Sequence, residues 1–511
     1  MTIESKLNEL AARKAKALAM GGEEKIARRR AEGHLNARER IDLLLDKGTY
    51  VESGLYATSH LPEAREKTPA DGKIAGFGKI EGRQVAVVSN DMTVMGASSS
   101  VVNGKKIRHM REVASKSGIP LVFLGESTGA RMPDRMGAQG RAILGQDPAE
   151  YQRLRQSPWV SALLGSCYGS STWYACMSDF VVMRKGAQMA VASSRVTSMA
   201  IKQPVDAEEL GGWKLHSETT GLVDLVVDSD EQAIAAIKRY LSYLPSHHNE
   251  APPVHEVPAG ADESCKRITD IVPADGSKVY DVRKVVEAIA DPGSVFEIKA
   301  RFGKSLSTSL IRLNGRTVGV LANNPMFKGG AIDVDACNKA TSFLVFCDSF
   351  NIPIVFLVDQ PGFLIGIEGE RRAAPSKIIN WMNALSLVSV PKISVIMRKS
   401  YGQAYLNMGG GRNSDEVICW PTADLGFMAP EVSVNVLYGV KKEESPARYE
   451  ELLQQVTRDT SAWNLAALYE TQDVIDPRDT RSCLISMLDL HRKRLGSEVG
   501  RHLLSNWPTS Y

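Results

Sequence analysis

Four glycine-bearing segments, two in each half of the chain, are the part of this sequence best suited to chemistry. Each follows a short apolar run typical of a buried strand and precedes residues that could open a helix. They are residues 125–131, 167–171, 359–363 and 400–404. A strand that ends in a glycine turn and opens a helix presents backbone N–H groups at the helix N-terminus. Two such groups can hold a developing oxyanion without a charged side chain.

The four segments occupy matched positions because the chain contains an internal repeat. Residues 82–90 align with residues 315–323 at a shift of 233 positions (315 minus 82). The same shift relates residues 119–124 to 352–357, Tyr168 to Tyr401, and Lys106 to Lys339. Upstream, a shift of 245 (283 minus 38) aligns Arg38, Asp46, Gly48 and Glu52 with Arg283, Asp291, Gly293 and Glu297. The first copy therefore has 12 extra residues (245 minus 233) before Gly82. We infer two copies of one domain, with two related binding sites.

A plainer interpretation is that each glycine only permits a turn with positive φ. For any single loop that interpretation is the better one. Four loops at matched positions of a duplicated chain favour binding sites instead. Stabilisation of an enolate by backbone groups is therefore the chemistry that the sequence predicts.

Apolar strand-like runs alternate with helical patterns in both copies, which predicts an α/β fold with helices packed over sheets. The strand-like runs are residues 85–88, 121–124, 318–321 and 354–358, and the helical patterns are Val101–Ser117 and residues 336–350. Residues 1–45 are predicted to be helical, with Gly48 just past the end. The proline-rich, aperiodic residues 244–260 indicate a linker or else a structured loop. We predict an N-terminal domain of residues 1–244, a linker of residues 245–270 and a C-terminal domain of residues 271–511.

The bulk composition excludes several classes of function. A formal net charge of +3 gives no reason to expect nucleic acid as a partner. No apolar run approaches the roughly 20 residues of a transmembrane helix, and the charged N-terminus does not resemble a secretory signal. Seven cysteines, scattered and without a CxxC pair, indicate reduced thiols in the cytoplasm and no metal site.

Side chains that usually carry catalysis are scarce in these loops. None of the nine histidines lies in them. Ser127 is the one candidate nucleophile, because residues 125–129 spell GxSxG after a strand-like run. The matched loop of the second copy has no serine, so a nucleophile elbow is the weaker hypothesis. Arg131 has two interpretations, binding of a phosphate or carboxylate and pairing with a local acid that fixes the loop.

The loops and several further motifs resemble the carboxyltransferase (β) subunit of biotin-dependent acyl-CoA carboxylases, of the propionyl-CoA carboxylase type. The further motifs are residues 35–40, 208–212, 346–353, 358–363 and 420–423, which spread the resemblance over nearly the whole chain. It implies a crotonase-like fold in each half and a hexamer built from dimers. The first half would bind acyl-CoA and the second carboxybiotin. The active site would lie where the first half of one subunit meets the second half of another.

The same resemblance implies roles for individual residues. N–H groups at Gly169 and Ser170 would hold the thioester enolate oxygen, and those at Gln403 and Ala404 would polarise the biotin ureido oxygen. Carboxybiotin would release CO2, the freed ureido nitrogen would take the α-proton, and the enolate would attack CO2. No side-chain base or metal is then needed. The remaining substrate-binding residues are expected to be Gly129, Ala130, Arg131, Ser171, Gly362, Phe363, Gly402, Tyr405 and Leu406.

Some positions depart from the family pattern. The family commonly has paired glycines in both loops, whereas this chain has Ser170 and Gln403. Leu406 replaces an aspartate of propionyl-type enzymes, at a position that resembles one influencing acyl preference. The acyl group thus stays open between propionyl-, acetyl- and methylcrotonyl-CoA. The chain has no biotin-attachment or ATP-grasp motif, so we expect a biotin carboxylase and a biotin carboxyl carrier on a separate (α) subunit.

Three other functions remain as alternatives. The first is the alpha subunit of a biotin-dependent carboxyacyl-CoA decarboxylase, which runs the transfer in reverse. The second is a non-catalytic assembly scaffold of the same fold. The third is a serine hydrolase built on Ser127.

Overall fold

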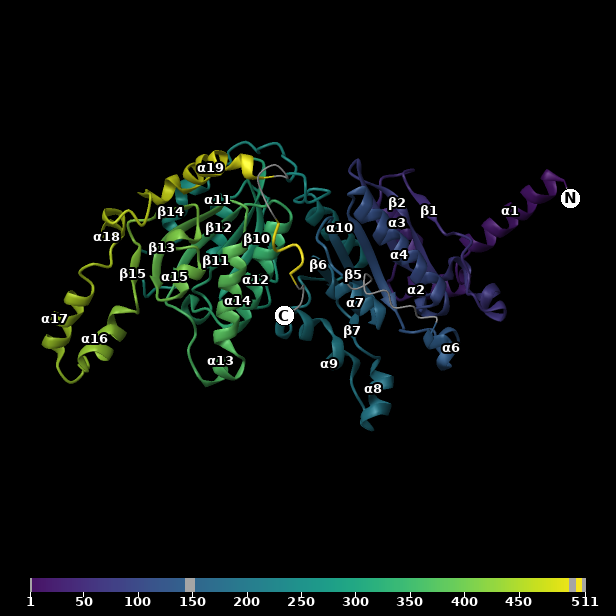
Figure 1. Ribbon diagram of the computed structural model, residues 1–511, viewed down its shortest axis with the longest axis horizontal. Coiled ribbons are helices and arrows are strands. Elements are labelled where there is room, and N and C mark those ends of the chain that lie inside the picture. The colour runs from purple at the N-terminus through teal and green to yellow at the C-terminus, as the bar shows by residue number, and fades with distance from the viewer. Residues whose placement is uncertain (1, 143–151, 496–501, 508–511) are drawn as a thin grey trace. The chain divides into compact units, whose positions relative to one another are not determined.

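The computed structural model describes residues 2–142, 152–495 and 502–507. The chain forms two compact units, of which the first runs to His247 and the second begins at His248 (Figure 1). No helix among the described residues is both long and apolar enough to cross a bilayer.

The described part of the first unit contains an eight-stranded mixed sheet with the order β1-β2-β3-β4-β5-β6-β8, in which β7 also pairs with β5. Strands β1 to β3 are antiparallel and the rest are parallel. The strands are β1 Val51–Ser53, β2 Lys73–Ile80, β3 Arg83–Asn90, β4 Leu121–Ser127, β5 Trp159–Tyr168, β6 Phe180–Arg184, β7 Gln188–Ala190 and β8 Leu225–Val227.

The described part of the second unit repeats this sheet strand for strand. Its order is β9-β10-β11-β12-β13-β14-β16, with β15 paired to β13, and the same pairs are parallel and antiparallel. The strands are β9 Phe296–Ile298, β10 Leu306–Leu313, β11 Arg316–Asn323, β12 Ile354–Gln360, β13 Lys392–Tyr401, β14 Glu416–Cys419, β15 Asp424–Gly426 and β16 Asp473–Val474. The predicted duplication and α/β class are confirmed.

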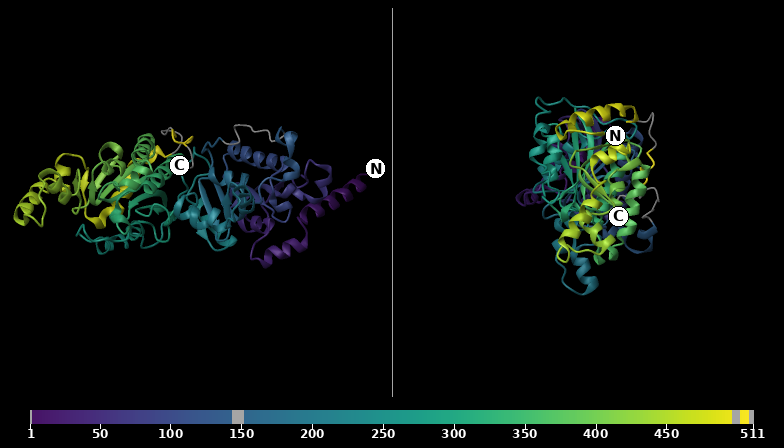
Figure 2. Two further views of the ribbon diagram at one scale, coloured as in Figure 1. Left: turned by 90° about the horizontal axis from the view of Figure 1, so that it is seen from below. Right: turned by 90° about the vertical axis from the view of Figure 1, so that its left-hand side faces the viewer.

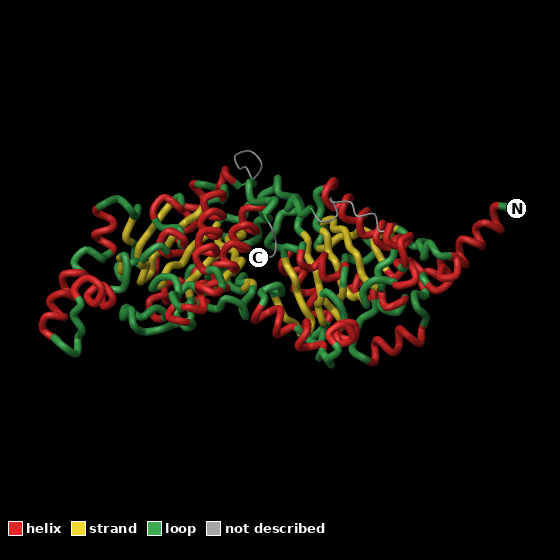
Figure 3. The backbone as a smooth tube through the Cα atoms, turned by 60° about the horizontal axis from the view of Figure 1, so that its bottom comes forward, coloured by secondary structure: helices red, strands yellow, loops and turns green. Residues whose placement is uncertain are grey.

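Helices pack on the sheets of both units, and Figure 3 shows them as red coils around the yellow strands. The first unit has α1 Ile3–Leu18, α2 Glu23–Ala31, α3 Ala37–Leu44, α4 Val101–Ser117, α5 Met132–Arg135, α6 Gly137–Ala142, α7 Ser170–Cys176, α8 Ser194–Ile201, α9 Ala207–Gly211 and α10 Asp230–Leu241. The second has α11 Val282–Ile289, α12 Val334–Ser349, α13 Ile367–Arg371, α14 Ala374–Leu387, α15 Ala404–Asn407, α16 Pro430–Tyr438, α17 Pro446–Val456, α18 Ala462–Ala467 and α19 Thr480–Leu490. Figure 2 shows α16 and α17 as a helical hairpin at one end of the second unit.

The apolar faces of the long helices build the cores. In the first unit, Ile107 and Met110 of α4 pack with Val88 and Phe123 of the sheet. In the second, valines of α11 pack with the buried strands β11 and β12. Because the parallel strands are buried, their sequences are continuous apolar runs and do not alternate between polar and apolar residues.

Two lysines that are 233 positions apart hold equivalent loops in the two units by hydrogen bonds to main-chain carbonyl groups. Lys106 of α4 donates hydrogen bonds to the carbonyl oxygens of Gly54, Ala70 and Lys73. Lys339 of α12 donates to those of Lys299, Phe302 and Leu306 at 2.7–2.9 Å. Burial lowers the pKa of Lys106 to about 8 and that of Lys339 to about 7. The aligned lysines of the sequence thus perform the same structural task in each unit.

The N-terminal 45 residues do not form one helix, as the sequence predicted, but three. Met20, with φ of 53°, and Gly22, with φ of 96°, lie between α1 and α2, and Gly33, with φ of 75°, follows α2. These left-handed values interrupt the helical backbone at both points. Asn36 then begins α3 with a capping box that includes Glu39.

The stretch expected to be a linker is ordered at its C-terminal end. Residues 265–270 form a short 3₁₀ helix, and its Cys265 and Ile268 are buried in the core of the second unit. The preceding residues 254–255 run beside the β10–β11 turn, where the His255 N–H donates to the Gly315 carbonyl at 2.8 Å.

Candidate active site: two matched glycine turns

The turn after β5 in the first unit contains consecutive backbone N–H groups without a partner in the described part of the chain. Gly169 has φ of 63°, a left-handed value that favours glycine. Its carbonyl accepts hydrogen bonds from the N–H groups of Thr172 (3.0 Å) and Trp173 (3.2 Å). The N–H groups of Gly169, Ser170 and Ser171 have no acceptor among the described residues, and the last two lie at the start of α7. Two adjacent free donors of this kind can stabilise an oxyanion.

The turn after β13 in the second unit has the same construction. Gly402 also has φ of 63°, and its carbonyl accepts from the Tyr405 N–H at 3.1 Å. The Leu406 N–H donates to the Gln403 carbonyl at 3.0 Å. Within the described chain, the N–H groups of Gln403 and Ala404 likewise have no acceptor. In the second unit the pair falls at the predicted residues Gln403 and Ala404, whereas in the first unit the matching pair is Ser170 and Ser171, one position beyond the predicted Gly169 and Ser170. Their use as oxyanion donors stays a prediction.

The side chains around the Gly402 turn differ in exposure. The Gln403 side chain is exposed, whereas Ala404 is buried. Tyr405 is half-buried and its hydroxyl oxygen accepts from the Gly411 N–H at 2.8 Å. Leu406 is half-buried beside it. A side chain at Gly402 would place its Cβ 3.1 Å from the Phe427 carbonyl, so the turn is tight as well as left-handed.

The other two predicted loops lie at the ends of β4 and β12, and each strand has an irregularity of register just before its loop. Pairing with the next strand shifts between Gly125 and Ser127, and between Val358 and Gln360. A bulge of this kind re-aims the chain where a strand ends. Residues 125–127, predicted as part of a loop, instead belong to β4, because their register with β5 continues past the shift.

Main-chain pairing then fixes the glycines of these loops. The Ser99 N–H donates to the Gly129 carbonyl at 2.8 Å, and Ala130 forms a parallel bridge with Ser99. In the second unit, the Ile332 N–H donates to the Gly362 carbonyl at 3.1 Å, and Phe363 bridges Ile332. In the first unit this brings two predicted loops together, since a Cβ built on Gly169 would lie 3.8 Å from the Gly129 Cα.

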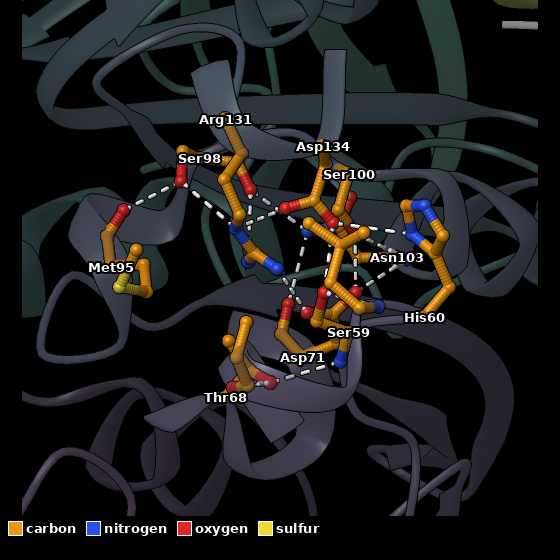
Figure 4. A network of polar contacts seen from close by, with 12 residues as sticks. Ser59, His60, Thr68, Asp71, Met95, Ser98, Ser100, Asn103, Arg131 and Asp134 are labelled. Atoms are coloured by element: carbon orange, nitrogen blue, oxygen red, sulfur yellow. Dashed lines mark hydrogen bonds and ion pairs between the residues drawn. The ribbon is translucent and has the colours of Figure 1, made fainter. Parts of the chain in front are cut away.

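Arg131 points into the protein and pairs with an acid (Figure 4). Its Nη1 lies 2.5 Å from Asp71 Oδ1, and its Nε donates to Ser98 Oγ at 3.3 Å. Both charged side chains are almost fully buried, with 1% and 0% of their surface exposed. Of the two interpretations offered by the sequence, the arrangement corresponds to an acid pair that fixes the loop. Asp71 gave no signal because the residue 233 positions further on is Lys304, so the repeat does not preserve the acid.

Ser127 does not have the geometry of a nucleophile elbow. An elbow serine lies on an exposed turn between a strand and a helix. Ser127 is fully buried within β4, and its Oγ accepts from the Gly129 N–H at 3.1 Å. The hydroxyl thus supports the Gly129 turn.

Buried carboxylates lie at the ends of β4 and β12, one position before Ser127 and one position before its counterpart Gln360. These two acids were not predicted from the sequence. Glu126 contacts Arg40 and Arg29, each at 2.5 Å. Burial opposes its ionisation, but these two arginines outweigh burial and lower the pKa of Glu126. Asp359, the matched residue, contacts Arg398 at 2.8 Å. Both acids follow an apolar run at the same position of the repeat, and this pattern could have predicted them.

Comparison with known proteins identifies the family. The chain matches the carboxyl transferase domain over residues 28–500 and belongs to this family. It is 34% identical to the propionyl-CoA carboxylase carboxyltransferase subunit of Haloferax mediterranei, over 98% of each chain. It is 30% identical to the methylmalonyl-CoA decarboxylase subunit alpha of Veillonella parvula, over 95% of this chain and 96% of that one.

A solved structure agrees with this assignment. The transcarboxylase 12S hexamer, crystallised with hydrolysed methylmalonyl-coenzyme A, matches with a TM-score of 0.88 at 34% identity over 98% of each chain. The protein is therefore a carboxyltransferase of the biotin-dependent carboxylase type. The predicted pair of crotonase-like domains is confirmed, as is the family assigned from the sequence motifs.

Proposed function

We propose that the chain transfers carboxylate between carboxybiotin, carried by a partner, and the α-carbon of a short acyl-CoA. The observation that carries this proposal is the repeated pair of free N–H groups after Gly169 and Gly402. Each reacting partner has one oxygen that needs such a pair, namely the thioester oxygen and the ureido oxygen.

In the first unit, the N–H groups of Ser170 and Ser171 hold the thioester oxygen. Loss of the α-proton turns this oxygen into an enolate, so its negative charge grows as the reaction proceeds. Donors that are fixed beforehand stabilise that charge without reorganising, and a single such donor contributes about 10²- to 10³-fold in rate. Gly169 supports this arrangement because its φ of 63°, a value that favours glycine, forms the turn that opens α7.

In the second unit, the N–H groups of Gln403 and Ala404 suit the ureido oxygen, a neutral carbonyl-type acceptor. When bound, carboxybiotin supplies the carboxyl group and afterwards a basic ureido nitrogen. The role of this chain is to orient that oxygen, while half-buried Tyr405 and Leu406 border the same turn. Because the ureido nitrogen takes the α-proton and this chain binds the two oxygens, the proposed reaction needs no side-chain base.

The acyl group is proposed to be short. The family relatives carry names with propionyl-CoA and methylmalonyl-CoA, which support a three- or four-carbon acyl chain over a long one. Propionyl-CoA is our first choice, ahead of acetyl- and methylcrotonyl-CoA. We also propose assembly into a hexamer, as in the transcarboxylase 12S structure, and a cytoplasmic biotin carboxylase and carrier subunit as partner.

The reverse transfer is the second candidate. It is favoured by the 30% identity to a methylmalonyl-CoA decarboxylase subunit across nearly the whole chain. Both directions use the same two donor pairs, so the partner subunits decide between them. Co-purification of an ATP-dependent biotin carboxylase would favour carboxylation, whereas its absence from an active complex would favour decarboxylation.

The direct test uses the purified chain, free biotin and a panel of malonyl-, methylmalonyl- and longer carboxyacyl-CoA esters, with acyl-CoA product followed by chromatography. Biotin-dependent loss of CO2 from one ester is expected and would name the acyl group. Gly169→Val should abolish it while the oligomer persists. Gly186→Val is the matched control, because Gly186 also has positive φ (84°) in open space but lies in the turn after β6. A silent wild-type oligomer would favour the scaffold alternative.

A further inference from the structure

Ser99 and Ser170 are joined by a hydrogen bond between their hydroxyl groups, with an Oγ–Oγ distance of 2.5 Å. Ser170 also carries one of the two N–H groups at the start of α7 that have no acceptor among the described residues. Ser99 lies two residues before α4, and its backbone pairs with the neighbouring loop. Its N–H donates to the Gly129 carbonyl, and its carbonyl accepts from the Arg131 N–H at 2.9 Å. Ser99 is therefore bonded to both candidate loops of the first unit.

The side chains on either side of Ser99, those of Ser98 and Ser100, contact the Arg131–Asp71 ion pair (Figure 4). Ser98 accepts a hydrogen bond from Arg131, and Ser100 donates one to the Asp71 carboxylate. Arg131 and Asp71 pair with each other in turn. Ser98 and Ser100 thus tie residues 98–100 to a buried ion pair. The Ser99 hydroxyl is presented to Ser170 from a rigid support.

The second unit lacks this arrangement, although it keeps the backbone pairing. Ile332 stands at the position of Ser99 and makes the same two main-chain bonds, to Gly362 and Leu364. Its apolar side chain cannot donate or accept, and Gln403 stands at the position of Ser170. The main-chain pairing therefore belongs to the shared fold. The hydroxyl pair serves something particular to the first unit.

We propose that Ser99 is a positioning residue that holds the Ser170 hydroxyl away from the N–H groups beside it. This inference rests on the proposed function of those N–H groups. A serine hydroxyl near a helix start readily accepts hydrogen bonds from local backbone donors. If the Ser170 Oγ accepted a hydrogen bond from its own N–H, it would occupy one of the two donors proposed for the enolate oxygen. The bond to Ser99 removes this competition and keeps the donor pair open.

The test compares variants in the biotin-dependent decarboxylation of the ester that the wild type prefers. Ser99→Ala should lower kcat about 5- to 10-fold, the effect of one hydrogen bond, with KM for the ester within about twofold. Ser170→Ala in the same background should restore most of the lost kcat, because the competing hydroxyl is gone. A residue that only stabilises the fold would show no such rescue.

Ser161→Ala is the matched control. Ser161 and Ser178 form the same kind of hydroxyl pair, with an Oγ–Oγ distance of 2.6 Å, within the first unit but away from the candidate loops. This variant should keep kcat within about twofold of the wild-type value, because Ser161 is remote from the reacting groups. Thermal unfolding of both single variants should show a similar loss of stability.

Two results would overturn the inference alone, given an active wild type. One is a Ser99→Ala variant that behaves like Ser161→Ala. The other is a double variant whose kcat falls below that of Ser99→Ala. A wild-type chain without biotin-dependent activity on any ester would instead remove the proposed function, and the inference with it.

Discussion

Gly169 and Gly402, 233 positions apart, have the same backbone φ of 63°. Each ends the fifth strand of its unit and starts a short helix with two free N–H groups. The duplication has therefore preserved the geometry of a donor pair, although the residues that follow the glycine differ. Serines follow it in the first unit, and Gln403 and Ala404 follow it in the second. The backbone carries the shared chemistry, which leaves the side chains free to distinguish the two ligands.

Gly402→Ala should impair the use of biotin more than that of the CoA ester. An L-residue at this φ costs about 1–2 kcal/mol, and its Cβ would lie 3.1 Å from the Phe427 carbonyl. The turn should relax and misdirect the Gln403 and Ala404 donors. We expect KM for free biotin to rise about tenfold, with KM for the ester within about twofold. Steady-state kinetics with each substrate varied in turn would measure this. An equal rise in both KM values would argue against separate sites for the two ligands.

The sequence predicted the parts of the fold that repeat. Matched apolar runs located β3, β4, β11 and β12, and the aligned Lys106 and Lys339 turned out to close equivalent loops. It did not predict the contacts that join distant segments of one unit. Asp71 meets Arg131 across 60 positions, and Ser99 meets Ser170 across 71. Such pairs follow no period of a helix or strand, and neither has a counterpart in the second copy, so neither hydropathy nor the repeat could reveal them.

Ser127→Ala should keep the transferase activity. Ser127 is buried, and its hydroxyl accepts from the Gly129 N–H at 3.1 Å and donates to the Gly129 carbonyl at 3.4 Å. Its loss leaves one buried donor without a partner, which costs about 1–3 kcal/mol of stability. We expect kcat within about threefold of the wild type and a lower thermal midpoint. A fall of a thousandfold or more, as for a lost nucleophile, would instead support the hydrolase alternative.

Lys339→Met should change how stability depends on pH. The folded-state pKa of Lys339 is lowered by burial from 10.5 to about 7, so between these values the unfolded chain binds more protons than the folded one. Wild-type stability therefore gains from this lysine as pH rises through that window. The variant lacks this gain and leaves three carbonyls without their donor.

The measurement is thermal or denaturant unfolding of both proteins at about pH 7 and pH 9. The advantage of the wild type over Lys339→Met should grow with pH by an amount on the order of 1–2 kcal/mol. Lys278→Met, which removes an exposed lysine of the same unit, should show no such trend. A constant difference between wild type and Lys339→Met would mean that the lysine stays protonated when folded.

Arg131→Met separates the two interpretations of this arginine. If Arg131 fixes the loop through Asp71, removing it leaves a buried unpaired carboxylate, at a cost of about 3–5 kcal/mol. Replacing Asp71 as well, in Arg131→Met/Asp71→Asn, should recover much of that stability, because no uncompensated charge remains. Activity should recover together with stability, since the Gly129 loop regains its position. If Arg131 instead bound a substrate phosphate, the double variant would be stable but would keep a raised KM for the CoA ester. Unfolding curves and ester kinetics on the same three proteins distinguish these outcomes.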